Sequence, residues 1–218
     1  MVGLGPSGYE SMSVGARSVL RSAPTVFVRT ARHPAVDDLI RNGVSIRSLD
    51  HLYESAECFE EVYARIASAI LDLASENAEV IYAVPGHPLV GEESVRIILR
   101  DAPLRGIATR VVGSASFIEA ALEALGISLS EGIKVLDALG LAEVHPDPDV
   151  GNLIYQVYDR LIASEVKLRL MERYPDCQPV RLVIGAGTPE QRVLDIPLFE
   201  LDRHEVDHLT TVYVSQKE

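Results

Sequence analysis

A turn rich in proline and glycine at residues 83–91 constrains the fold of this chain most. The apolar run at residues 80–82 leads into the turn, and a segment with the composition of a helix, residues 92–99, follows it. A strand that ends in such a turn and restarts as a helix places backbone amides at the carboxyl edge of a sheet, where open α/β proteins bind ligands. The sequence therefore predicts an α/β fold with a small-molecule site at this turn.

Strand-like and helix-like segments alternate through the first half of the chain. Apolar residues at helical spacing predict helices over residues 13–21, 36–42, 59–75 and 117–125, with Ser13 as the first N-cap. Runs of β-branched residues predict strands over residues 25–29, 44–46, 79–84 and 107–112. This order is typical of a parallel or mostly parallel sheet with covered faces.

The second half of the chain has a different order of predicted elements. It predicts a helix over residues 161–174 and strands over residues 134–139, 153–158 and 180–184. Residues 192–196 and 211–214 have the alternation of a late antiparallel pair. We therefore expect two α/β lobes, residues 1–112 and 116–218, with glycine turns that face one another across a ligand cleft.

Composition excludes several classes of protein. The chain has 218 residues, of which 47% are hydrophobic, so it can bury a full core. A net charge of −12 argues against nucleic-acid binding, which relies on basic surfaces. Two widely spaced cysteines argue against a disulfide scaffold and suit a reducing cytoplasm. No apolar stretch approaches the roughly 20 residues of a membrane span, so we expect a soluble cytoplasmic protein without membrane contact.

Glycine-containing turns at residues 3–8, 86–91 and 185–189 are candidate ligand cradles, because glycine lets backbone approach a ligand closely. Ordinary αβ turns remain an alternative for each of them. The first formally matches the dinucleotide fingerprint, but Arg29 stands where that fingerprint requires an acidic residue. Ser114 and Ser116 lack the Gly-x-Ser-x-Gly elbow of a serine hydrolase.

A metal site has one weak candidate. His204 and His208 are four residues apart, with Asp202 and Asp207 nearby. Because no third ligand of clear geometry accompanies them, a solvated surface is favoured, and no metal is expected.

Taken in chain order, the turns at residues 2–6, 84–90, 112–116 and 183–189 resemble the signature segments of the tetrapyrrole methylases, which are class III S-adenosylmethionine (SAM)-dependent methyltransferases. The resemblance covers essentially the whole chain. Residues 29–36, 82–90 and 156–160 are most similar to the methylase-like domain fused to MazG-type nucleoside triphosphate pyrophosphohydrolases. No acidic Glu-x-x-Glu repeat of the MazG type follows residue 214, so we expect only the methylase-like part here.

The resemblance implies a two-lobed fold, a homodimer, and SAM bound in the cleft between lobes. It assigns cofactor contacts to eleven positions: Leu4, Pro6, Gly86, His87, Val90, Ser116, Phe117, Gln156, Val157, Ala186 and Thr210. No catalytic residue is assigned, because alignment of a sulfonium with its nucleophile can supply much of the rate of methyl transfer.

Two functions follow from the resemblance. The first is methyl transfer from SAM to an unidentified small acceptor, with a tetrapyrrole as the family default. The second is a non-catalytic or regulatory SAM-binding module for a MazG-type domain in cis or in trans. Two residues suggest the second function. His87 stands where family methylases commonly have aspartate, and Ser7 stands in place of a glycine.

The first strand is also unusual, because only Met1 and Val2 precede the turn at Gly3. A parallel strand normally has about five residues. We therefore expect either a truncated first strand or a start further upstream.

Overall fold

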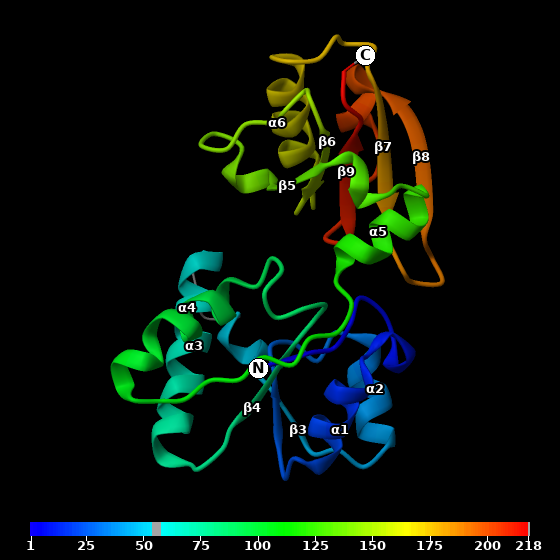
Figure 1. Ribbon diagram of the computed structural model, residues 1–218. Helices are drawn as coiled ribbons and strands as arrows, with labels where there is room; N and C mark the ends of the chain where they lie inside the picture. Colours follow the sequence, from blue (N-terminus) through cyan, green and yellow to red (C-terminus); the bar gives the residue numbers. More distant parts are fainter. Residues whose placement is uncertain (54–57, 218) are drawn as a thin grey trace. The chain divides into compact units, whose positions relative to one another are not determined.

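Parallel strands and helices alternate from the first residues of the chain (Figure 1). The computed structural model describes residues 1–53 and 58–217. The chain divides into two units, Met1–Phe117 and Ile118–Glu218. Each unit has its own sheet and its own helices, and the predicted mixed α/β fold is confirmed. No helix in the described part of the chain is long and apolar enough to cross a membrane.

The first unit is a three-layer α/β/α arrangement. Its sheet has the order β1-β4-β2-β3 and is parallel throughout, and its strands are β1 (Val2–Gly3), β2 (Val26–Val28), β3 (Ile46–Ser48) and β4 (Ile81–Val84). The helices are α1 (Val14–Ser22), α2 (Pro34–Arg41), α3 (Phe59–Glu76) and α4 (Glu93–Asp101). Figure 1 shows α1 and α2 on one side of the sheet and α3 and α4 on the other. Two apolar clusters result, one under each helix pair.

Helix α1 begins where the sequence predicts. The Ser13 hydroxyl accepts a hydrogen bond from the amide of Ala16 at 3.1 Å, as an N-cap does. The same hydroxyl donates to the carbonyl of Gly113 at 2.7 Å. One side chain therefore starts the helix and ties it to a segment 100 residues away.

Strand β1 has two residues, yet it is bonded on both sides. The amide of Leu4 donates to Val84 at 2.9 Å, and the amide of Gly3 donates to Val112 at 2.9 Å. Of the strand predicted over residues 107–112, only Val112 pairs, in a single bridge to Val2. The prediction was wrong for residues 107–111: the Met1 amine donates to the carbonyl of Arg110 at 2.7 Å, but the two-residue strand β1 is too short to form a ladder beside them.

The second unit has a mixed five-stranded sheet of order β5-β6-β9-β7-β8. The strands are β5 (Ile133–Asp137), β6 (Gly151–Tyr155), β7 (Pro179–Ile184), β8 (Arg192–Pro197) and β9 (Thr210–Val214). Helix α5 (Phe117–Leu125) precedes them, and α6 (Arg160–Met171) packs with the 3₁₀ helix η6 (Leu198–Arg203) over the core. Buried Leu170, Leu182 and Leu198 come from three of these elements.

The predicted pairing of residues 192–196 with residues 211–214 was wrong. Both strands are antiparallel to β7, but β8 lies on one side of it and β9 on the other. Strand β9 lies between β6 and β7. Alternation of apolar residues identifies a strand and its buried face but not its partner, so adjacency in the chain misled the prediction.

His33 links helix α2 to the first glycine turn. Its Nδ1 accepts a hydrogen bond from the amide of Ala35 at 3.3 Å, and its Nε2 lies 3.1 Å from the carbonyl of Gly5. These partners place the ring proton on Nε2. Burial lowers the pKa of His33 to about 4, with a smaller contribution from Arg29 and with the bond to Gly5 opposing the shift.

This environment predicts an acid-sensitive contribution to folding. The unfolded chain binds a proton at His33 near pH 6.5 and the folded chain only near pH 4, so folding stability falls as the pH drops through this window. We expect the free energy of unfolding to fall by about 2 to 3 kcal/mol over this window because of His33. In denaturant titrations, the free energy of unfolding of wild type minus that of His33→Asn should decrease from neutral pH to pH 4. A difference that is constant with pH would contradict the assignment.

Candidate functional site

Three of the four predicted ligand segments meet in the first unit. The amide of Gly86 donates to the carbonyl of Gly5 at 2.8 Å, and the amide of Gly5 donates to the carbonyl of Gly86 at 3.1 Å. The hydroxyl of Ser114 donates to the carbonyl of Gly3 at 2.7 Å. The turns that follow β1 and β4 are thus joined backbone to backbone, and the segment at residues 113–116 is bonded to the first of them.

The glycines at this junction are required by close approach. A Cβ on Gly3 would lie 2.5 Å from the carbonyl oxygen of Gly86, and Gly5 and Gly86 have φ of +77° and +63°. Gly8 precedes a 3₁₀ turn (Tyr9–Ser11) and does not open a helix. The glycine pattern of residues 3–8 therefore serves loop-to-loop packing and lacks the helix start that a dinucleotide fingerprint needs.

His87 stabilises the turn in which it lies. Its Nδ1 accepts a hydrogen bond from the amide of Leu89 at 3.1 Å, the bond that an aspartate carboxylate makes in an Asx turn. The ring packs against Gly113, where a Cβ would lie 2.3 Å from Nε2. The bond uses the lone pair on Nδ1, so this nitrogen is the acceptor.

The predicted contact residues of the first unit differ in what they can offer a ligand. Leu4 is fully buried in the core below the loops, so only its backbone is available. Ser116 is buried, whereas Pro6, His87 and Val90 are partly exposed. Phe117, also partly exposed, begins helix α5.

The predicted residues of the second unit gather at one edge of its sheet. Gln156 follows the last residue of β6, Ala186 lies two residues after β7, and Thr210 begins the antiparallel strand β9. The register pairs Ile184 with Thr210 and so aligns these ends. Val157 adjoins them but is fully buried.

Gln156 has an unusual backbone conformation. Its φ of +64° is the only positive value at a non-glycine position in residues 1–53 and 58–217. A left-handed glutamine is strained, and such strain clusters at functional sites. The same conformation ends β6 at Tyr155, three residues before the predicted end of the strand.

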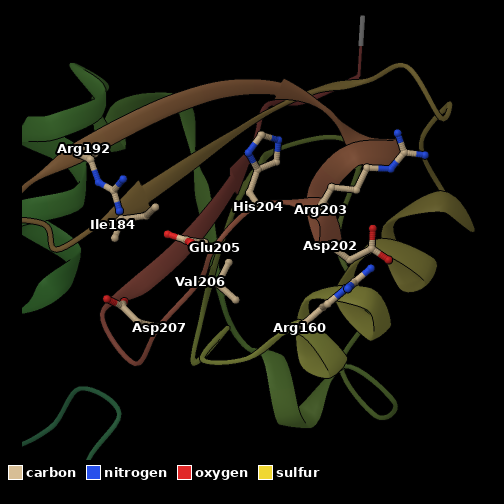
Figure 2. A pocket seen from close by; sticks show the side chains of 9 residues that line it. All are labelled: Arg160, Ile184, Arg192, Asp202, Arg203, His204, Glu205, Val206 and Asp207. Atoms are coloured by element: carbon tan, nitrogen blue, oxygen red, sulfur yellow. The ribbon is translucent and has the colours of Figure 1, made fainter.

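A cavity of about 630 Å³ opens at the same edge of the second sheet (Figure 2). It is lined by Arg160, Ile184, Arg192 and residues 202–207. Figure 2 shows Arg160 and Arg192 on opposite sides of the hollow. No predicted contact residue lines it, although Ile184 directly precedes the Gly185 turn and Asp207 accepts a hydrogen bond from the Thr210 hydroxyl at 3.0 Å.

The structure also places the histidines considered as metal ligands. His208 is exposed, as a solvated surface requires, but His204 is half-buried and lines the cavity, so the surface interpretation was wrong for His204. Asp202 is bound to Lys167 at 2.5 Å. Among residues 1–53 and 58–217, no group of three or more His, Cys, Asp and Glu could hold a metal ion.

One charged pair beside the ligand turns was missed. Arg29, at the carboxyl end of β2, and Glu92, the N-cap of α4, lie 3.3 Å apart between Nε and Oε2. Burial raises the pKa of Glu92 to about 7, and Arg29 opposes this shift. The available signal was Arg29 itself, an isolated charge directly after an apolar strand.

This chain is similar to a known protein family and to a curated protein. Residues 1–202 match the family described as Tetrapyrrole (Corrin/Porphyrin) Methylases. The uncharacterized protein YabN of Bacillus subtilis (strain 168) is 37% identical over 215 residues, which cover 98% of this chain and 44% of YabN. The chain thus spans less than half the length of this curated relative.

Solved structures share the fold. Uroporphyrin-III-C-methyltransferase from Thermus thermophilus aligns with a TM-score of 0.72 and 21% identity, over 99% of this chain and 90% of that chain. A complex of this enzyme with S-adenyl homocysteine aligns at 0.69 and 20% identity, over 98% and 95%. The methyltransferase CobJ aligns at 0.72 and 18% identity, over 99% and 92%. Because the family match covers residues 1–202, the chain belongs to the tetrapyrrole methylases.

Proposed function

We propose that this chain binds SAM and transfers its methyl group to a small acceptor that is not yet identified. The observation that carries the proposal is the joining of the family's first three signature turns at the carboxyl edge of a parallel sheet, through the reciprocal bonds of Gly5 and Gly86. Ligands of open α/β proteins bind at such edges. The complex of a related fold with S-adenyl homocysteine supports the choice of ligand.

The proposed binding residues divide by the atoms they offer. Leu4 and Val157 are fully buried, so each would contact the ligand through its backbone. Gln156 would present its peptide groups from a left-handed conformation. The remaining proposed contacts are Pro6, Gly86, His87, Val90, Ser116, Phe117, Ala186 and Thr210. In this proposal the lobes are residues 1–112 and 116–218, and the protein is a cytoplasmic homodimer.

His87 supports a working cofactor turn. Since its Nδ1 already accepts the Leu89 amide, the imidazole takes over the turn-forming function of an aspartate. We therefore infer that substitution of the usual aspartate does not by itself abolish binding. SAM supplies an electrophilic methyl group when bound, and the chain's own residues hold and orient it.

A regulatory module is the second candidate. The length of YabN leaves room for a second domain of this kind, because more than half of that relative lies outside the matched region. In this version the chain binds SAM or its product without transfer and serves a MazG-type domain. Release of labelled methyl groups from SAM to tetrapyrrole precursors or other small acceptors would favour the enzyme.

Titration calorimetry tests ligand binding first. We expect S-adenosylhomocysteine to bind the chain with a Kd below about 100 μM, that is, with more than about 5.5 kcal/mol of binding free energy. ATP serves as a control that shares the adenosine but lacks the amino-acid part. The absence of heat for SAM and for S-adenosylhomocysteine would overturn the proposal.

Substitutions of Gln156 separate backbone from side-chain contacts. Gln156→Gly should raise the free energy of unfolding by about 1 kcal/mol, because glycine adopts positive φ without strain. If the ligand contacts only the backbone, the Kd for S-adenosylhomocysteine should stay within about threefold, whereas Gln156→Val should weaken binding and stability together. Loss of binding in the stable glycine variant would show that the side chain is the contact.

Substitutions of His87 test its role in the turn. Asparagine keeps an acceptor for the Leu89 amide, so His87→Asn should retain affinity, while His87→Ala should weaken ligand binding about fivefold as the turn loosens. Equal affinity losses in both variants would instead indicate a direct contact made by the imidazole.

A further inference from the structure

The second ligand turn, residues 85–91, is held differently at its two ends. At the start, Gly86 is bonded in both directions to Gly5. Within the turn, the amides of Leu89 and Val90 are bonded to His87. At the far end, Gly91 has φ of +68° and is followed by Glu92, whose carboxylate meets Arg29.

The side chain of Glu92 does not cap the helix that it begins. It is the N-cap of α4, yet its side chain makes no capping hydrogen bond. The carboxylate points instead to Arg29 and is only 8% exposed, while the Arg29 side chain is 20% exposed. The Glu92 side chain thus contacts a residue that follows a neighbouring strand and makes no bond to its own helix.

The surroundings hold the pair in place. An Arg29 guanidinium nitrogen donates to the hydroxyl of Tyr53 at 3.2 Å, and the Arg29 amide donates to Ala83 of β4 at 3.0 Å. Tyr82 bonds to Ser94 at 2.8 Å in the buried layer beside the pair. The ionisable groups that interact with Arg29 are Glu92, the tyrosines Tyr53, Tyr63 and Tyr82, and His33, whose pKa Arg29 lowers.

Stability alone is a poor reason for this arrangement. Removing two charges from water is expensive, and well-packed apolar side chains usually serve stability equally well or better. The pair is held by attraction between the charges at 3.3 Å, and the buried Arg29 Nε makes no hydrogen bond, so the contact keeps the two side chains together without a bidentate fork. The end of the turn at Gly91 therefore follows the position of Arg29 on β2.

We propose that Arg29 and Glu92 are positioning residues, which clamp the far end of the turn at residues 85–91 so that it is ordered before ligand binds. The inference rests on the proposed function, because this turn is the one assigned to the cofactor. Neither side chain needs to touch the ligand.

The experiment compares three variants of the full chain. Glu92→Gln removes the charge at nearly constant size, and Arg29→Met/Glu92→Met replaces the pair by apolar groups. Glu93→Gln is the matched control, since Glu93 is the next residue of the same helix and pairs with Arg96 on the surface, where the two side chains are 38% and 66% exposed. For each, ¹⁵N relaxation of the turn amides, the Kd for S-adenosylhomocysteine and the thermal midpoint are measured.

For Glu92→Gln and for the double variant, we expect the order parameters of the Leu89 and Val90 amides to fall from about 0.85 to below about 0.6, while those of β4 stay unchanged. We expect the affinity for S-adenosylhomocysteine to fall about tenfold. Glu93→Gln should change neither, and the double variant should keep the thermal midpoint of wild type.

Two results would overturn the proposal: wild-type order of the turn in the double variant, or a loss of order that spreads through β4 and α4. The relaxation arm needs no ligand. If wild type binds no S-adenosylhomocysteine, the proposed function fails, and the amides of Leu89 and Val90 still decide whether the pair positions the turn.

Discussion

The reciprocal backbone bonds between Gly5 and Gly86 are the contact on which the first unit's site depends. They require two backbone segments to approach so closely that a side chain on Gly3 would collide with the carbonyl of Gly86. Once the turns after β1 and β4 are joined in this way, the segment at residues 113–116 is held by Ser13 and Ser114. The surface to which we assign the ligand is therefore formed largely by backbone.

Sequence patterns predicted most elements because local spacing determines them. The helices at residues 59–76 and 117–125 were placed correctly by apolar periodicity, and Ser13 by its capping chemistry. The predictions that failed concern the pairing of strands that are distant in sequence. Residues 107–111 alternate in hydrophobicity but have no partner strand. The position of β9 between β6 and β7 cannot be derived from the order of the strands along the chain.

The candidate site shows the same division. The turns were found from glycine and proline, but the bond from Leu89 to His87 and the meeting of Arg29 with Glu92 join groups whose relation only folding creates. The left-handed conformation of Gln156 could not be foreseen either, because glutamine has no preference for it. In the proposed site, His87 makes its turn-forming bond through a side chain that differs from the usual aspartate.

The position of strand β9 has a consequence for how the second unit forms. Strands β5 and β6 make one parallel pair and β7 and β8 one antiparallel pair, and only residues 210–214 join the two into a sheet. Two-stranded fragments are marginal in water, so neither pair is expected to persist alone. The sheet of this unit therefore closes only when its C-terminal strand is in place, through contacts that are distant in sequence.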